Sequence, residues 1–90
     1  MLIEKDIEVV NKLGLHARAA AKLVKLCAGY DSNITLHNGG KSIDAKSIMG
    51  VLMLAAAQGA ELKLVVDGVD ANEAADRING LFVDCFGEGE

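Results

Sequence analysis

The alternation of apolar and polar residues along the chain predicts four β-strands. In the first, residues 3–10, apolar side chains occupy every second position except at Lys5, as in a strand with one buried face. The sequence Asn38-Gly39-Gly40 favours a tight turn between the second and third strands, which therefore form a hairpin. The second, third and fourth strands are expected over residues 33–37, 41–44 and 61–67.

Apolar residues spaced three and four positions apart predict three helices. The first covers residues 17–28, and the second covers 48–57 after Ser47, a favoured N-terminal cap. Asp70 is expected to cap the third helix, and the tail 87–90 is expected to be frayed. The apolar stripe of the third helix is Ala71, Ala74, Ala75, Ile78, Leu81, Phe82 and Cys85.

The order of elements is therefore β-α-β-β-α-β-α in a single domain, residues 1–90. A chain of this length has room for two layers, so we expect an α+β open-faced sandwich in which helices cover one face of a four-stranded sheet. The hairpin requires at least one antiparallel pair. The pattern alone leaves the order of the strands open.

Composition excludes several classes of protein. The chain is 51% hydrophobic and 24% charged, which favours a folded domain. No apolar run approaches the length of a membrane span, and the N-terminus does not resemble a secretion signal, so we expect a soluble cytoplasmic protein without membrane insertion. Cys27 and Cys85 match no metal or redox spacing and are expected to be buried thiols. The net charge of −4 and the lack of strand aromatics argue against nucleic-acid binding.

The charge is unevenly distributed. Residues 11–46 contain six bases and two acids, whereas residues 61–90 contain eight acids and two bases. One interpretation is that these are simply solvated faces. The other is a basic docking surface near His16, suited to an acidic partner or a phosphate.

His16 is the strongest candidate for chemistry. It lies at the start of the first predicted helix, where unpaired backbone N–H groups, here those of Ala17 and Arg18, favour an anion. Gly14 permits a tight turn before it, and the Arg18 guanidinium can contact a phosphate. No acidic residue is close in sequence, which suits a carrier of an anion better than a catalytic histidine. The alternative is that His16 is only a cap or a surface residue.

The sequence Gly14-Leu15-His16-Ala17-Arg18, followed about thirty residues later by Lys46-Ser47-Ile48-Met49-Gly50, resembles the HPr phosphocarrier family of the phosphoenolpyruvate-dependent phosphotransferase system. The resemblance covers essentially the whole chain. It implies that His16 accepts a phosphoryl group on Nδ1 from phospho-enzyme I and passes it to an EIIA-type domain, and that Arg18 contacts the phosphate. It also implies an antiparallel sheet of order 1-4-2-3 with three helices on one side.

Two positions depart from the usual family pattern. Ala19 replaces a proline, and Leu13 replaces a residue that is often polar and able to support the histidine. An N-terminal cap alone would explain Ser47. The resemblance adds that a dedicated HPr kinase/phosphorylase phosphorylates this serine in many relatives, so Ser47 is a candidate regulatory site.

A partner-docking surface is expected around His16, with Leu52 and one methionine buried and the remaining apolar residues exposed. Its residues are Leu15, Ala21, Lys25, Lys46, Ile48, Met49, Leu52 and Met53.

The sequence therefore predicts a monomeric relay protein rather than an enzyme, acting in sugar uptake and regulation without a metal or another cofactor. His37 is expected to face solvent. Two alternatives remain: a nitrogen-branch phosphocarrier with a regulatory output, and a small regulatory or adaptor module that is never phosphorylated.

Overall fold

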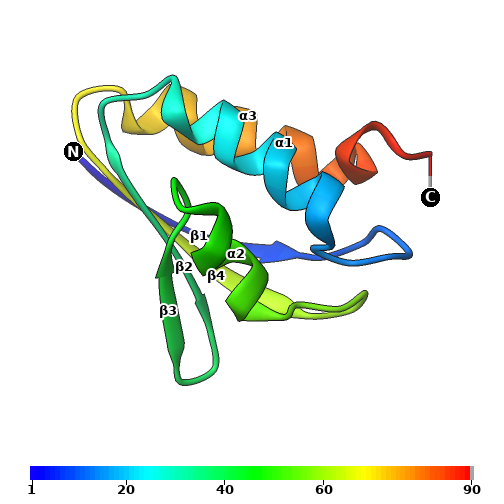
Figure 1. Cartoon of the computed structure of the whole chain (residues 1–90). Coiled ribbons are helices and arrows are strands. Elements are labelled where there is room, and N and C mark those ends of the chain that lie inside the picture. The colour runs from blue at the N-terminus through cyan, green and yellow to red at the C-terminus, as the bar shows by residue number, and fades with distance from the viewer. Residues whose placement is uncertain (90) are drawn as a thin grey trace.

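The computed structural model describes residues 1–89 and contains the predicted order of elements, followed by a short 3₁₀ turn, η1 (Figure 1). The strands are β1 (Leu2–Glu8), β2 (Asn33–Asn38), β3 (Lys41–Asp44) and β4 (Glu61–Asp67). The helices are α1 (Ala17–Ala28), α2 (Ile48–Leu54) and α3 (Ala71–Val83), and η1 covers Cys85–Gly87.

The four strands form one antiparallel sheet in the order β1-β4-β2-β3. β4 therefore lies between β1 and the hairpin. Its residue Leu64 pairs with Lys5 of β1 on one side and with Leu36 of β2 on the other. The helices cover one face of this sheet (Figure 1). The fold class and the strand order are both as expected.

An aliphatic core fills the space between the two layers. Its sheet side consists of alternate strand residues such as Ile34, Leu36 and Leu64, each at most 2% exposed. Leu23 and Ile78 are fully buried on the helix side. Cys27 is also fully buried, as expected, and desolvation raises the pKa of its thiol to about 12, so that it stays protonated at neutral pH. None of the helices within residues 1–89 is long and apolar enough to cross a bilayer.

Helix α2 differs from its prediction both in its length and in which of its residues are buried. It ends at Leu54 instead of continuing to residue 57, because Ala55 adopts a left-handed backbone with φ 52°. Val51 and Leu54, three positions apart, are the buried residues of this short helix. The expectation that Leu52 and one methionine are buried is wrong: Leu52 is 37% exposed, and the exposed fractions of Met49 and Met53 are 65% and 67%.

The two ends of α3 also differ from expectation. Asp70 precedes the helix but makes no side-chain cap. Its carboxylate accepts hydrogen bonds from the backbone N–H groups of Asp31 (2.8 Å) and Ser32 (3.0 Å), and so ties the loop after α1 to the start of α3. At the other end the helix stops at Val83, so Cys85 lies outside it and is half-buried.

The expectation of a frayed tail is wrong for Gly87 and Glu88, whose backbone N–H groups donate to the carbonyls of Asp84 (3.0 Å) and Cys85 (2.9 Å). The chain turns back beside the start of α1 (Figure 1). The Phe86 ring is 1% exposed and packs edge-on against Phe82, with 4.8 Å between the ring centroids. Lys22 Nζ donates to the Phe86 carbonyl at 2.6 Å. The Phe86 ring thus fixes the C-terminal turn against α3, and the Lys22 donor fixes it against α1.

Candidate functional site

His16 is the N-terminal cap of α1. Its backbone is extended (φ −76°, ψ 179°), and its carbonyl accepts the Ala20 N–H at 2.8 Å to open the helix. Its Nδ1 accepts the Arg18 backbone N–H at 3.3 Å. The side chain is 27% exposed, so one edge of the ring is accessible to solvent. The ring therefore lies where the positive end of the helix dipole can stabilise an anion bound at Nδ1.

Gly14 and Leu15 place His16 by fastening the preceding loop to the end of α2. The Leu15 N–H donates to the Ala56 carbonyl at 2.9 Å. Gly14 has φ +67°, and a Cβ atom at this position would lie 2.5 Å from the same carbonyl oxygen. Leu15 is only 5% exposed, so the expectation that its side chain contacts partners is wrong: it is part of the core.

A carboxylate contacts the other ring nitrogen. The side chain of Glu88, itself 10% exposed, accepts a hydrogen bond from His16 Nε2. The amide of the fully buried Asn11 donates to Glu88 Oε1 at 3.1 Å and to the Gly14 carbonyl at 2.8 Å. Because a carboxylate can only accept and Arg18 N–H can only donate, the two contacts together assign the proton to Nε2 and the lone pair to Nδ1.

The pKa of Glu88 reflects this environment. Burial acts to raise it, but the hydrogen bonds from His16 and Asn11 and the nearby charge of Lys22 outweigh burial, so that the pKa is lowered from its usual value. Glu88 is therefore ionised at neutral pH.

The expectation that no acidic group orients His16 is wrong. Glu88 lies 72 residues away in sequence, in the segment expected to be frayed. The signal that could have revealed it is Phe86, an apolar residue four positions after Phe82 that continues the buried stripe beyond the helix.

Arg18 is exposed at the second position of α1 and lines a hollow of about 410 Å³ beside Glu88. Lys12 and Leu13 line the same hollow, so two cations face it. Leu13 is 67% exposed and carries no polar group, and support for the histidine comes from Glu88 and Asn11 instead. Ala19, which stands at the usual proline position, retains a backbone N–H in the first turn of α1.

The remaining predicted site residues lie on α1, on α2 and in the segment just before α2. Ser47 caps α2, with its Oγ accepting the Gly50 N–H at 3.1 Å. Lys46 is half-buried, and its Nζ donates to the Tyr30 carbonyl at 2.7 Å. We use the term docking surface for the predicted partner-docking residues without Leu15. Apart from Lys46, the residues of this surface are exposed. The two helices that carry most of them, α1 and α2, pack against each other. The docking surface consists of Ala21, Lys25, Lys46, Ile48, Met49, Leu52 and Met53.

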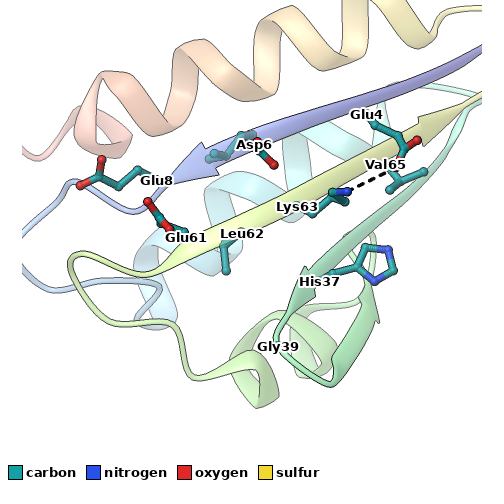
Figure 2. Close-up of a pocket in the computed structure, with 10 residues that line it drawn as sticks. Glu4, Asp6, Glu8, His37, Gly39, Glu61, Leu62, Lys63 and Val65 are labelled. Atoms are coloured by element: carbon teal, nitrogen blue, oxygen red, sulfur yellow. Dashed lines mark ion pairs between the residues drawn. The ribbon is translucent and has the colours of Figure 1, made fainter.

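A second hollow, which His16 does not line, lies on the open face of the sheet (Figure 2). Acidic side chains from β1 and β4 line it, with Lys63 paired to Glu4 at 3.7 Å. His37 is half-buried at its edge, where its Nδ1 and the Ser42 hydroxyl are 2.6 Å apart. The excess of carboxylates disfavours a phosphate here. Within residues 1–89, no three His, Cys, Asp or Glu side chains gather as metal ligands.

Comparison with known proteins decides the family. Residues 3–84 match the family described as the PTS HPr component phosphorylation site. The chain belongs to the HPr phosphocarrier family. A phosphocarrier protein HPr of Cupriavidus necator is 47% identical over 89 residues, covering 99% of this chain and all of the relative. A phosphocarrier protein NPr of Shewanella violacea is 42% identical over 86 residues, covering 96% of this chain and 94% of the relative.

A solved structure of the HPr fold agrees. The crystal structure of HPr-C-His from Thermoanaerobacter tengcongensis is 41% identical and superimposes with a TM-score of 0.92, covering 96% of this chain and 97% of that one. As a member of the HPr family the protein is a phosphocarrier of the phosphotransferase system, a relay rather than a catalyst. Family membership implies enzyme I and EIIA-type partners.

Proposed function

We propose that His16 is the residue of this HPr protein that carries the phosphoryl group, on Nδ1. The observation that supports this most directly is the position of Nδ1. It bears the ring's lone pair at the N-terminus of α1, while Nε2 is turned to Glu88. A nucleophile whose lone pair accepts only a long hydrogen bond from the Arg18 N–H, at a helix N-terminus that also carries a guanidinium, has what a phosphoryl acceptor needs.

The transfer is an in-line displacement at phosphorus. Nδ1 attacks the phosphoryl group of phospho-enzyme I, the donor P–N bond breaks, and the Nδ1–P bond forms. Backbone N–H groups of the first turn and the Arg18 guanidinium then bind the phosphoryl oxygens. The same steps in reverse deliver the group to the EIIA acceptor. An open site suits a relay, since tight enclosure would stabilise the bound state as much as the transition state.

The docking surface is proposed to receive both partners in turn. Its exposed methionines, Met49 and Met53, offer flexible apolar contacts, and Lys25 offers a charge to acidic partners. We assign the protein to the sugar branch because Ser47 lies in the sequence Lys46-Ser47-Ile48-Met49-Gly50, which favours that branch. We place the protein in the cytoplasm. It is proposed to act as a monomer.

Ser47 is proposed as a regulatory site for an HPr kinase/phosphorylase. Its hydroxyl is exposed and already caps α2, so a phosphate there would remain near backbone N–H groups. It would add about two negative charges next to the exposed apolar residues of α2. Ser47→Asp should therefore slow phosphorylation by enzyme I while Ser47→Ala retains the wild-type rate, measured by phosphate incorporation. Equal rates for the two variants would argue against regulation at this position.

The decisive experiment is incubation with phosphoenolpyruvate and enzyme I, followed by detection of acid-labile phosphate. The wild type should be labelled on His16, and His16→Ala should not be labelled at all. Arg18→Ala should be labelled about 10- to 100-fold more slowly because a phosphate contact is lost. His37→Ala is the matched control and should behave as the wild type.

Two results would redirect the assignment. Labelling by the nitrogen-branch enzyme I, with none by the sugar-branch enzyme I, would place the protein in the nitrogen branch. A wild-type protein that neither enzyme labels would favour the adaptor function.

A further inference from the structure

The C-terminal turn brings a carboxylate to His16 through several independent contacts. Phe86 is buried against Phe82, and Lys22 donates to its carbonyl. Cys85 and Phe86 both have left-handed backbones, with φ 54° and 55°. Such conformations are unfavourable for non-glycine residues and persist only where the surrounding contacts impose them. The position of Glu88 is therefore imposed by the fold.

The proton on Nε2 has a chemical consequence for the phosphorylated ring. When Nδ1 bonds to phosphorus it gives up its lone pair, so a ring that retains the Nε2 proton becomes a cation. On the next transfer the Nδ1–P bond breaks and its electron pair returns to Nδ1. If Nε2 still carries the proton, the leaving group is neutral imidazole. If that proton has been lost, the leaving group is the imidazolide anion, which is far less stable.

We propose that Glu88 is a positioning residue that retains the Nε2 proton of His16 through both transfers, so that the phosphoryl group always leaves from a cationic ring. This inference rests on the proposed role of His16. The carboxylate accepts from Nε2 in the unphosphorylated protein and faces an imidazolium after phosphorylation, where the contact becomes an ion pair. No proton enters or leaves the ring during a cycle.

The charged groups around Glu88 support this role. Arg18 and Lys12 line the adjacent hollow, and Lys22 lies alongside, close to Gly87. These three cations and His16 lie around Glu88, on α1 and in the loop before it. The hydrogen bonds from His16 and Asn11 and the charges of His16 and Lys22 outweigh burial and lower the pKa of Glu88, and an ionised carboxylate is what favours a protonated Nε2. Asn11 completes the site by fixing one carboxylate oxygen.

Glu88→Gln tests the proposal because it keeps the size and a hydrogen-bond acceptor but removes the charge. Both proteins are phosphorylated with enzyme I, purified, and mixed with the EIIA domain between pH 6 and pH 9. The variant should match the wild type at pH 6, where solvent protonates the ring, and transfer at least about tenfold more slowly at pH 8.5. Glu88→Asp should recover part of the alkaline activity. Glu61→Gln, an equal change of charge on the open sheet face, should follow the wild type.

Nitrogen NMR of the His16 ring gives a second readout. At pH 8 the phosphorylated wild type should retain the Nε2 proton and the phosphorylated Glu88→Gln protein should have lost it. Identical pH profiles for wild type and Glu88→Gln would overturn the proposal, and so would a uniform fall in rate at every pH, which indicates misplacement alone. A wild type that never becomes phosphorylated would instead refute the proposed function of His16.

Discussion

Asn11 shows how a single buried residue can join distant parts of a site. Its amide nitrogen donates to Gly14 in its own loop and to Glu88 near the C-terminus. A fully buried amide with two such partners specifies one geometry, since losing either would leave a polar atom unpaired in the interior. The orientation of the His16 ring therefore depends on the loop that contains Gly14 as well as on Glu88.

Gly14→Ala should destabilise the protein and slow phosphorylation. The new Cβ would lie 2.5 Å from the Ala56 carbonyl oxygen and 2.9 Å from Ala57 Cα, and φ would remain at +67° unless the loop moved. Left-handed strain costs about 1–2 kcal/mol, and the clash adds to it. We expect a loss of about 2–4 kcal/mol in the free energy of unfolding, measured by urea denaturation, together with slower labelling of His16.

Gly39→Ala is the matched control. Gly39 has nearly the same φ, +62°, but nothing lies within 4 Å of its Cβ position. Only the backbone strain should remain, about 1–2 kcal/mol, with labelling of His16 unchanged. Equal losses in the two variants would show that the close approach of Gly14 to Ala56 has no energetic effect.

At the scale of elements, the sequence predicts what local patterns determine. Ser47 caps α2 and Asn38-Gly39-Gly40 turns the hairpin, because both depend on neighbouring residues only. Asp70 has the same local pattern as Ser47, yet its carboxylate bonds to a loop 38 and 39 residues away. Glu88 is a similar case. The periodic pattern of a sequence does not predict the hydrogen-bond partner of a side chain when that partner belongs to another element.

The contacts of Asp70 predict an acid-sensitive link between α1 and α3. Hydrogen bonds from the Ser32 hydroxyl and from the backbone of Asp31 and Ser32 outweigh burial and lower the pKa of Asp70. A carboxyl whose pKa is lower in the folded state stabilises the fold above its unfolded pKa, and this contribution disappears as pH falls through the folded pKa. Asp70→Asn should thus be less stable than the wild type at pH 7.

Thermal unfolding at several pH values checks this prediction. The difference in stability between wild type and Asp70→Asn should be constant from neutral pH to about pH 5 and should shrink as pH falls below the usual pKa of an aspartate, about 3.9. Asp76→Asn, exposed on the same helix, is the control and should stay close to the wild type throughout. A difference that persists unchanged into acid would contradict a role for the Asp70 charge.

At the scale of the whole molecule, basic side chains follow α1 and acidic side chains gather on the open face of the sheet. Arg18, Lys22 and Lys25 lie on α1, the helix that His16 caps, whereas the open face of the sheet exposes Glu4, Asp6, Glu8 and Glu61 around the hollow in Figure 2. The sequence predicted an imbalance between residues 11–46 and 61–90, and of these four carboxylates only Glu61 belongs to the second range. The acidic face arises instead because β1 and β4 are neighbours in the sheet. A partner with acidic groups is therefore expected to approach the face that carries His16, the proposed phosphoryl acceptor.

This asymmetry predicts how salt and charge reversal alter encounter with phospho-enzyme I. The second-order rate of His16 phosphorylation should fall as NaCl rises, because exposed charges are screened within about 8 Å at physiological ionic strength. Lys25→Glu should lower that rate about three- to tenfold at low salt and flatten its salt dependence. Lys63→Glu makes the same charge change on the open sheet face and should leave both nearly unaltered. If the two variants lose rate equally, net charge rather than its placement governs the encounter, and the basic face of α1 does not steer the partner.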